Sequence, residues 1–219
     1  MFFAGGAIVA ERPAMAAGAE AEFTPIFNGK DLTGWEGKPE WRVEDGAITC
    51  DKPCAKEHYL IWRGGKPADF DLRAEFKLVG GNSGIQFRSR ELPDFDAAGY
   101  QADMCTIGFW YGALYNTAAG GFDALRGQKV EIDQGGKKTV TALGDAAELL
   151  KRVKPGDWNE YRIVAQGDTI TLWINGVMMS QTTDRQQGKA ARAGIIALQM
   201  HPNLQMKVQY KNIRIKNLN

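Results

Sequence analysis

Alternating apolar and polar residues on both sides of one glycine-rich turn restrict this chain to a β-rich fold more strictly than any other feature of its sequence. In residues 69–79, DFDLRAEFKLV, the apolar side chains at every second position from Leu72 to Leu78 face one way, and the charged side chains between them face the other. The turn-forming sequence GGNSG follows, and the same alternation resumes in residues 85–88. Strands are therefore predicted on both sides of this turn.

The stretch that begins at this turn and ends at residue 103 carries the most informative polar side chains. Its first strand turns Gln86 and Arg88 to the same side. After a loop, a second short alternation turns Gln101 and Asp103 to one side and Tyr100 to the other. Amide, guanidinium and carboxylate groups held on strands are a plausible basis for a site that binds polyols.

The rest of the chain consists of short segments with strand character, separated by turn residues. Asp45-Gly46 and Asn175-Gly176 are two-residue hairpin signals. Residues 145–153 form the one predicted helix, with Asp145 as its N-cap. Further strands are predicted within residues 23–35, 41–49, 58–62, 129–133, 137–141, 158–166, 169–174, 193–200 and 207–216. This pattern predicts an all-β fold, an antiparallel β-sandwich of two packed sheets with one short helix, in a single domain of residues 23–219.

Charge and cysteine content narrow the possible functions. The chain of 219 residues has 27 basic and 26 acidic residues and a formal net charge of +1, which removes the main electrostatic support for nucleic-acid binding. Cys50 and Cys54 are close enough in sequence to form a disulfide in an oxidising compartment, or to remain two unpaired thiols. Cys105 is expected to be buried and inert because no histidine or other base flanks it.

The N-terminal segment is predicted to be an export signal or an apolar arm outside the folded domain. Residues 2–10 are largely apolar, and Ala14-Met15-Ala16 has the small-x-small form of a signal-peptidase site. If residues 1–22 are an export signal, the protein is periplasmic or extracellular. No other run approaches the roughly 18 apolar residues that a membrane-spanning helix requires.

Polar side chains at strand positions form the candidate functional surface. For any single one of them, ordinary solvated surface is a sufficient explanation. As a set they are rich in glutamine, arginine, aspartate and histidine, and neighbouring strands would unite them on one face. Aromatic side chains could lie beside this face or, alternatively, be buried in the core. The polar candidates are Arg73, Glu75, Gln86, Arg88, Gln101, Asp103, Gln199 and His201, and the aromatic ones are Tyr100, Trp110 and Tyr115.

Several blocks of the sequence, in order, resemble one known family. They are IFNGKDLTGW, WRVEDGAI, DFDLRAEFKL, GGNSGIQFR, GYQADM, GALY, KPGDWNEYRIVAQGDTITLWINGV, IIALQMH and MKVQYKNIRIK. The family is the 3-keto-disaccharide hydrolase domain, first described as a bacterial domain of unknown function, and the resemblance covers residues 23–218. It implies a concanavalin A-like sandwich, export from a bacterial cell, and cleavage of 3-keto-glycosides or 3-keto-disaccharides.

The chemistry of such a substrate suggests roles for the candidate residues. A ketone at carbon 3 acidifies the proton on carbon 2, so a base can start an elimination that expels the group on carbon 1, and water then adds. The candidates for proton transfer are Glu75, Asp103 and His201, with Arg88 holding the enolate oxygen. The expected substrate-binding groups are Gln86, Gln101 and Gln199 for hydroxyls, with Tyr100, Trp110 and Tyr115 as aromatic faces.

Other interpretations remain open from the sequence. Glu75 and Asp103 could act by direct displacement, and a carboxyl separation of about 5 to 5.5 Å would predict retention of configuration. The same two carboxylates and His201 could instead bind Ca²⁺ or another divalent cation. A non-catalytic carbohydrate-binding module and, less favoured, a structural β-sandwich use the same fold.

Overall fold

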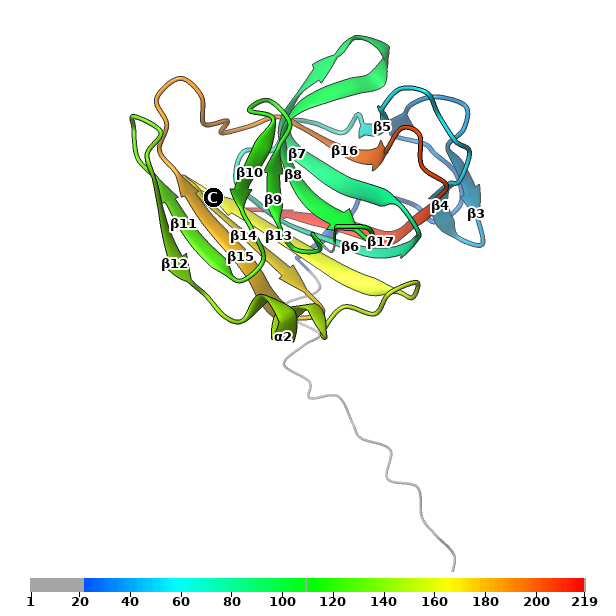
Figure 1. Ribbon diagram of the computed structural model, residues 1–219. Coiled ribbons are helices and arrows are strands. Elements are labelled where there is room, and N and C mark those ends of the chain that lie inside the picture. Colours follow the sequence, from blue (N-terminus) through cyan, green and yellow to red (C-terminus); the bar gives the residue numbers. More distant parts are fainter. Residues whose placement is uncertain (1–21, 109, 219) are drawn as a thin grey trace, which may run out of the picture.

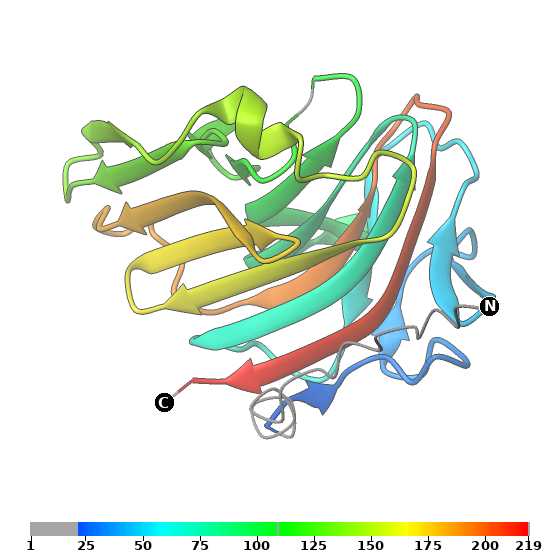
Figure 2. The same ribbon diagram turned by 90° about the horizontal axis from the view of Figure 1, so that it is seen from below.

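The structure is a computed structural model that describes residues 22–108 and 110–218, and two curved β-sheets pack face to face within it (Figures 1 and 2). The predicted export signal therefore falls almost wholly outside the described residues. None of the helices in the described part is long and apolar enough to cross a membrane.

The larger sheet has ten strands in the order β12-β11-β15-β14-β13-β6-β17-β4-β3, with β1 paired to β17. Its strand pairings are antiparallel except that of β11 with β15, which is parallel, so this sheet is mixed rather than purely antiparallel. Its strands are β1 (Thr24–Pro25), β3 (Arg42–Glu44), β4 (Ala47–Cys50), β6 (Phe70–Val79), β11 (Gln128–Ile132), β12 (Lys138–Ala142), β13 (Asn159–Gln166), β14 (Thr169–Ile174), β15 (Val177–Asp184) and β17 (Lys207–Asn217).

The smaller sheet has seven strands in the order β10-β9-β8-β7-β16-β5-β2, all antiparallel. They are β2 (Trp35–Glu36), β5 (His58–Trp62), β7 (Asn82–Leu92), β8 (Asp96–Cys105), β9 (Leu114–Asn116), β10 (Gly121–Ala124) and β16 (Ile195–Met200). A short 3-10 helix, η1 (Pro93–Phe95), joins β7 to β8.

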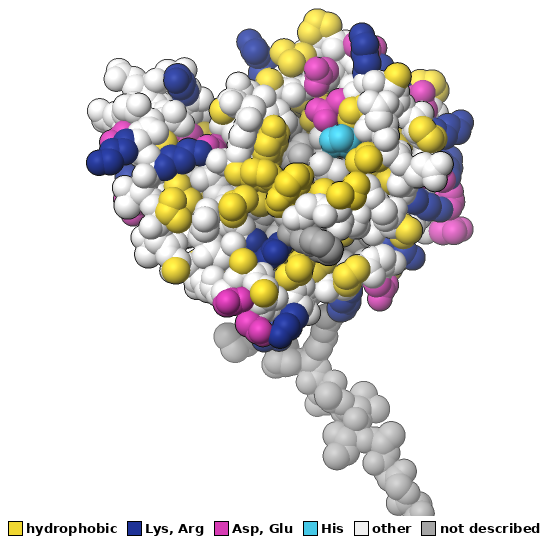
Figure 3. Space-filling model, viewed as in Figure 1, with side chains coloured by type: hydrophobic (Ala, Val, Ile, Leu, Met, Phe, Trp, Pro, Cys, Tyr) yellow, Lys and Arg dark blue, Asp and Glu magenta, His cyan; other side chains and the backbone are white. Residues whose placement is uncertain are grey.

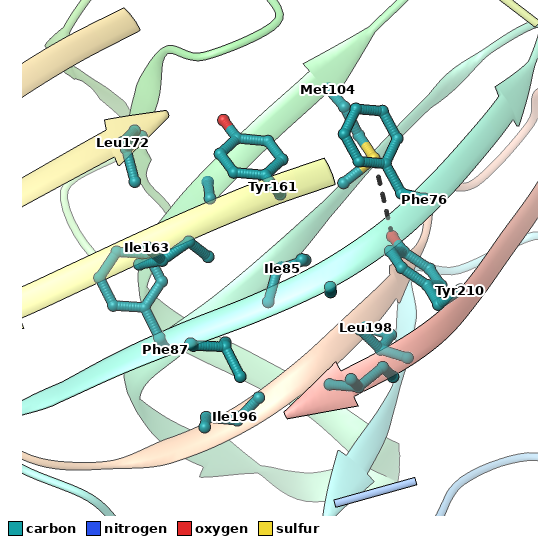
Figure 4. Close-up of a cluster of buried hydrophobic side chains, with 14 of the residues drawn as sticks. Phe76, Ile85, Phe87, Met104, Tyr161, Ile163, Leu172, Ile196, Leu198 and Tyr210 are labelled. Atoms are coloured by element: carbon teal, nitrogen blue, oxygen red, sulfur yellow. Dashed lines mark hydrogen bonds between the residues drawn. The ribbon is translucent and has the colours of Figure 1, made fainter. Parts of the chain in front are cut away.

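The core lies between the two sheets (Figure 4). Alternate residues of β6, among them Leu72 and Phe76, are at most 1% exposed, as their spacing predicts. On the smaller sheet, Ile85 and Phe87 point into the same core, and so do Ile196 and Leu198. Because successive strand residues point to opposite faces, the residues between them on β7 and β16 are turned to the outer face of the smaller sheet. That outer face carries the candidate site.

The predicted hairpins and helix are present, with one difference in length. Asp45 and Asn175 adopt the positive φ angles, both 51°, that their two-residue turns require. Asp145 caps the helix α2 (Ala146–Leu150), accepting hydrogen bonds from the backbone N–H groups of Ala147 at 2.8 Å and Glu148 at 2.9 Å. The helix is shorter than predicted because the chain after Leu150 continues in i→i−3 turns, in which the N–H groups of Arg152 and Val153 donate to the carbonyls of Leu149 at 3.1 Å and Leu150 at 3.0 Å.

The three cysteines are unpaired in the structure, so Cys50 and Cys54 are not bridged. Burial raises the pKa of the Cys50 thiol to about 12. Cys105 is buried, as expected. The Cys54 thiol donates weakly to the backbone carbonyl of His201 at 3.6 Å, which ties the loop before β5 to the chain that follows β16.

Candidate functional site

A pocket of about 380 Å³ opens on the outer face of the smaller sheet. Polar side chains from β7, β8 and β16 form one part of its lining, and aromatic side chains near β9 and β10 form another. Figure 3 shows hydrophobic side chains gathered on this side of the molecule, beside a histidine and an acidic side chain. The lining residues are Glu57, Asn82, Gln101, Asp103, Trp110, Tyr115, Thr117, Phe122, Gln199 and His201.

The register of β7 and β8 makes room for the polar side chains. Gly84 lies opposite Asp103, and Gln86 lies opposite Gln101. A Cβ atom on Gly84 would lie 2.5 Å from Cγ and Cδ of Gln101. The glycine is therefore needed because the Gln101 side chain occupies the space that a Gly84 side chain would fill.

Gly84→Val is expected to displace Gln101 and to weaken binding of the 3-keto-glycoside that the sequence predicts as ligand at least tenfold, while the sandwich still folds. The control is Gly121→Val, because no atom lies within 4 Å of a Cβ placed at Gly121. Titration calorimetry with a 3-keto-glucoside and thermal unfolding would check both variants. Unchanged affinity in Gly84→Val would contradict the assignment of Gln101 to the binding surface.

Asp103 is the buried carboxylate of the pocket, with only 2% of its surface exposed. Burial raises the pKa of Asp103 to about 7, against the opposing effect of hydrogen bonds from Gln101 and the Met104 backbone, and Glu57 raises it further by charge repulsion. Both of those hydrogen bonds go to Oδ1, from Gln101 Nε2 at 3.2 Å and Met104 N at 3.1 Å. Oδ2 accepts none from the described residues, so it is available to a bound molecule.

The aromatic wall of the pocket consists of Trp110, Tyr115 and Phe122. The ring of Phe122 lies 5.2 Å from that of Trp110 and 5.0 Å from that of Tyr115, measured between centroids. Trp110 is 40% exposed, which is unusual for so large an apolar side chain. An exposed aromatic cluster beside polar groups suits a sugar ring, which has apolar C–H faces and polar edges.

Amide and imidazole groups complete the polar part. Gln199 donates from Nε2 to Glu57 Oε2 at 2.7 Å and accepts from Gln101 Nε2 at 3.3 Å. The His201 Nδ1 atom lies 2.9 Å from the Pro202 carbonyl, which leaves Nε2 for other partners. The side-chain oxygen of Asn82 is buried and has no hydrogen-bond partner in the described part of the chain. An unpartnered buried acceptor in a pocket is consistent with a bound ligand.

The predicted grouping of Glu75 with Asp103 and His201 is wrong. Glu75 belongs to β6 in the larger sheet, on the face turned away from the core, and its carboxylate accepts from Asn212 at 2.7 Å and lies 3.5 Å from Lys211 Nζ. The two-carboxylate displacement and the cation site that included Glu75 lose their geometric basis. Among the described residues, no group of three or more His, Cys, Asp or Glu side chains is arranged to hold a metal ion.

Arg88 is also in the wrong place for the role predicted for it, because a β-bulge interrupts the alternation of β7. The register shifts between Phe87 and Arg90, and Arg88 has a φ angle of 45°. Its side chain therefore points inward, with 1% exposed, and donates to the carbonyls of Ala68 at 2.7 Å and Gly167 at 2.9 Å, and to Asp69 at 2.8 Å.

Arg88→Met is expected to lower the free energy of unfolding by about 3 kcal/mol, because the buried guanidinium and its hydrogen bonds are lost together. Arg90→Met is the matched control, since Arg90 is exposed on the same strand and should change stability by less than about 0.5 kcal/mol. Denaturant unfolding measures both. Equal effects in the two variants would contradict a structural role for Arg88.

Two other candidates do not line the pocket. Tyr100 faces the core, where its hydroxyl donates to Asp184 at 2.6 Å, so its predicted position beside the polar surface is wrong. Gln86 is on the predicted face but fully buried, and its amide donates to Gln101 Oε1 at 3.3 Å and Thr117 Oγ1 at 3.1 Å. Gln86 therefore holds in place Gln101 and Thr117, which line the pocket.

Four lining residues were not among the sequence candidates: Glu57, Asn82, Thr117 and Phe122. Asn82 belongs to the glycine-rich sequence that predicted only a turn, and it is in fact the first residue of β7. Glu57 precedes β5, where no alternation marks a facing direction. The only signal for Glu57 in the sequence was its position directly before a predicted strand.

Comparisons with known proteins agree with this architecture. A family model described as the 3-keto-alpha-glucoside-1,2-lyase-like domain matches residues 22–216. Comparison with curated proteins gave no match.

Among solved structures, two proteins of Parabacteroides distasonis, provisionally described as glycosyl hydrolases, are similar to this chain. One has 20% identity, covers 95% of this chain and 99% of its own, and gives a TM-score of 0.62. The other has 22% identity, covers 90% and 99%, and gives a TM-score of 0.60. A Bacillus subtilis protein with a galectin-like fold has 11% identity, covers 89% of this chain and 94% of its own, and gives a TM-score of 0.61. At these identities the similarity shows a shared lectin-like sandwich fold.

Proposed function

This chain belongs to the family of 3-keto-alpha-glucoside-1,2-lyase-like domains, and we propose from that membership and its pocket that it cleaves 3-keto-glycosides by elimination followed by hydration. The observation that carries the proposal is Asp103, a buried carboxylate in a pocket between amide and aromatic side chains. A base whose pKa lies near neutrality suits removal of a carbon-bound proton.

The proposed reaction begins with transfer of the proton on carbon 2 to Oδ2 of Asp103. The electrons of the C2–H bond form the enolate, whose oxygen on carbon 3 accepts hydrogen bonds from the amide N–H groups of Asn82 and Gln199. Return of those electrons breaks the C1–O bond, and His201 gives a proton through Nε2 to the departing alcohol oxygen. Water then adds its hydroxyl to carbon 1 and gives its proton to His201, and Asp103 returns a proton to carbon 2. This completes hydrolysis and restores both side chains.

The lining of the pocket favours a neutral sugar. Glu57 and Asp103 are its carboxylates, and no lysine or arginine lines it among the described residues. A uronic acid would therefore place its charge near carboxylates without a cation to pair with. The aromatic wall would stack against the C–H face of the ring.

The proposal is tested by incubating the purified protein with a 3-keto-glucoside and with the matching ordinary glucoside and following aglycone release. Release from the keto sugar alone is the expected result. Binding of both sugars with release from neither would instead support the second candidate function, a carbohydrate-binding module, which the exposed aromatic wall would also serve.

The pH dependence of the reaction should report the role of Asp103. As the base, Asp103 must have lost its proton in the free enzyme, so the acid limb of the kcat/KM profile is expected to rise with pH toward about 7, the value to which burial raises its pKa. Initial rates between pH 5 and 9 would measure this. A kcat/KM that falls through the same range would mean that the protonated carboxyl is the active form.

A further inference from the structure

Five side chains beside the pocket form a closed ring of hydrogen bonds. Tyr59 Oη donates to Glu57 Oε1 at 2.6 Å, and Gln199 Nε2 donates to Glu57 Oε2 at 2.7 Å. Gln101 Nε2 donates to Gln199 Oε1 at 3.3 Å, and Gln86 Nε2 donates to Gln101 Oε1 at 3.3 Å. Gln86 Nε2 also lies 3.4 Å from Tyr59 Oη, which closes the ring.

Three members of this ring are glutamines, whose amide groups can turn over and exchange donor for acceptor. Glu57 is different, because an ionised carboxylate only accepts. Gln199 must therefore turn its NH₂ group toward Glu57 and its oxygen toward Gln101. Gln101 must then turn its NH₂ group toward Gln199 and Asp103, and its oxygen toward Gln86.

Asp103, which accepts from Gln101 at the other side of these glutamines, cannot fix the orientations of their amide groups permanently. While the Asp103 carboxyl lacks a proton, Oδ1 can only accept from Gln101, whereas a protonated carboxyl can also carry its O–H on Oδ1 and donate to the Gln101 oxygen. The pKa of about 7 means that Asp103 gains and loses this proton near neutral pH. Without Glu57, the orientation of Gln101 and Gln199 would follow the protonation state of Asp103.

We propose that Glu57 is a positioning residue whose carboxylate fixes the direction of the glutamine array, so that Gln101 and Gln199 present a constant pattern of donors and acceptors to the sugar. Gln199 lines the pocket, and its second N–H has no partner among the described residues, so it is available as a donor in a pocket that Asp103 and Asn82 also line. The inference rests on the proposed function only in taking the pocket's ligand to be a sugar.

The first test uses side-chain amide resonances in ¹⁵N-labelled full-length protein, which require no substrate. In wild-type protein the Gln199 NH₂ signals should stay constant between pH 5.5 and 8.5. In Glu57→Gln they should shift or broaden through the titration of Asp103, whereas in Glu57→Asp, which keeps the charge, they should not. Gln199 signals that behave alike in Glu57→Gln and wild type would overturn the proposal.

The second test is a double-mutant cycle on kcat/KM for methyl 3-keto-α-glucoside. Glu57→Gln and Gln199→Met are each expected to lower it about tenfold, and because Glu57 acts through Gln199, the double variant should lose no more than the worse single one. Tyr59→Phe, which removes a bond to Glu57 but not its charge, is the control and should lose less than threefold. Losses that multiply in the double variant would contradict the proposed coupling.

The two tests separate this inference from the proposed function. If wild-type protein releases no alcohol from the keto sugar while the amide signals respond as described, the proposed function fails and the positioning role of Glu57 stands. If turnover occurs and the amide signals do not respond to Glu57→Gln, the positioning role fails alone.

Discussion

Asp103→Asn is expected to lower kcat for a 3-keto-glucoside by about 10³-fold, within the range found when a general base is removed. Asparagine has nearly the same shape as aspartate, so the pocket should persist. Its side-chain oxygen can still accept the hydrogen bonds that Oδ1 receives from Gln101 and Met104. It cannot accept a proton from carbon 2.

Steady-state kinetics with the variant would check this loss, and a titration calorimetry measurement would show whether the sugar still binds. The expected combination is a large loss of kcat with an affinity within about threefold of wild type. A variant that keeps more than a tenth of wild-type kcat would remove Asp103 from the reaction and leave His201 as the remaining candidate base.

The same substitution is expected to change how stability depends on pH. The pKa of Asp103 is raised from 3.8 to about 7 by burial, so the folded protein holds this proton more tightly than the unfolded chain. Below pH 4 both states carry the proton. Between pH 4 and 7 the unfolded state loses it first, so the free energy of unfolding falls as pH rises, and above pH 7 the loss is complete.

The difference between the two pKa values corresponds to about 4 kcal/mol. Asp103→Asn has no such group, so its stability relative to wild type should increase by about that amount from pH 4 to pH 8. Urea unfolding at both values, with equal m-values required, measures the difference. A constant difference between the variant and wild type would mean that Asp103 titrates at its ordinary value.

Much of the fold could be predicted because its signals are local. The alternation in β6 fixes which residues enter the core, and Asp45-Gly46 and Asn175-Gly176 fix two hairpins through the backbone angles that they adopt. The direction in which Gln101 and Asp103 point was also predicted correctly. Both lie on a regular strand, on the face turned away from the core. Period-two reasoning is reliable where the strand has no irregularity.

The parts of the site that were missed depend on non-local structure. Arg88 follows a residue with regular strand geometry, but a bulge turns it inward, and its partners Ala68 and Gly167 come from distant segments. Glu75 has the correct facing for a polar residue but belongs to the other sheet. Glu57 joins the site only because β5 pairs with β16, which brings it to Gln199. The bulge in β7 sets the position of Arg88, and the strand order sets the positions of Glu75 and Glu57. Alternation within a strand encodes neither.

The most direct test of the account follows the hydrogen on carbon 2. A 3-keto-glucoside labelled with deuterium at that carbon is incubated with the protein, and the deuterium content of the released sugar is measured by mass spectrometry at early times. Labelled 3-keto-glucose alone is incubated as the control for spontaneous exchange. Elimination through Asp103 predicts loss of the deuterium from the sugar in step with release of the aglycone. Release of the aglycone with the deuterium retained, and at the same rate as from the unlabelled sugar, would mean that the C2–H bond is not broken and would contradict the proposed mechanism.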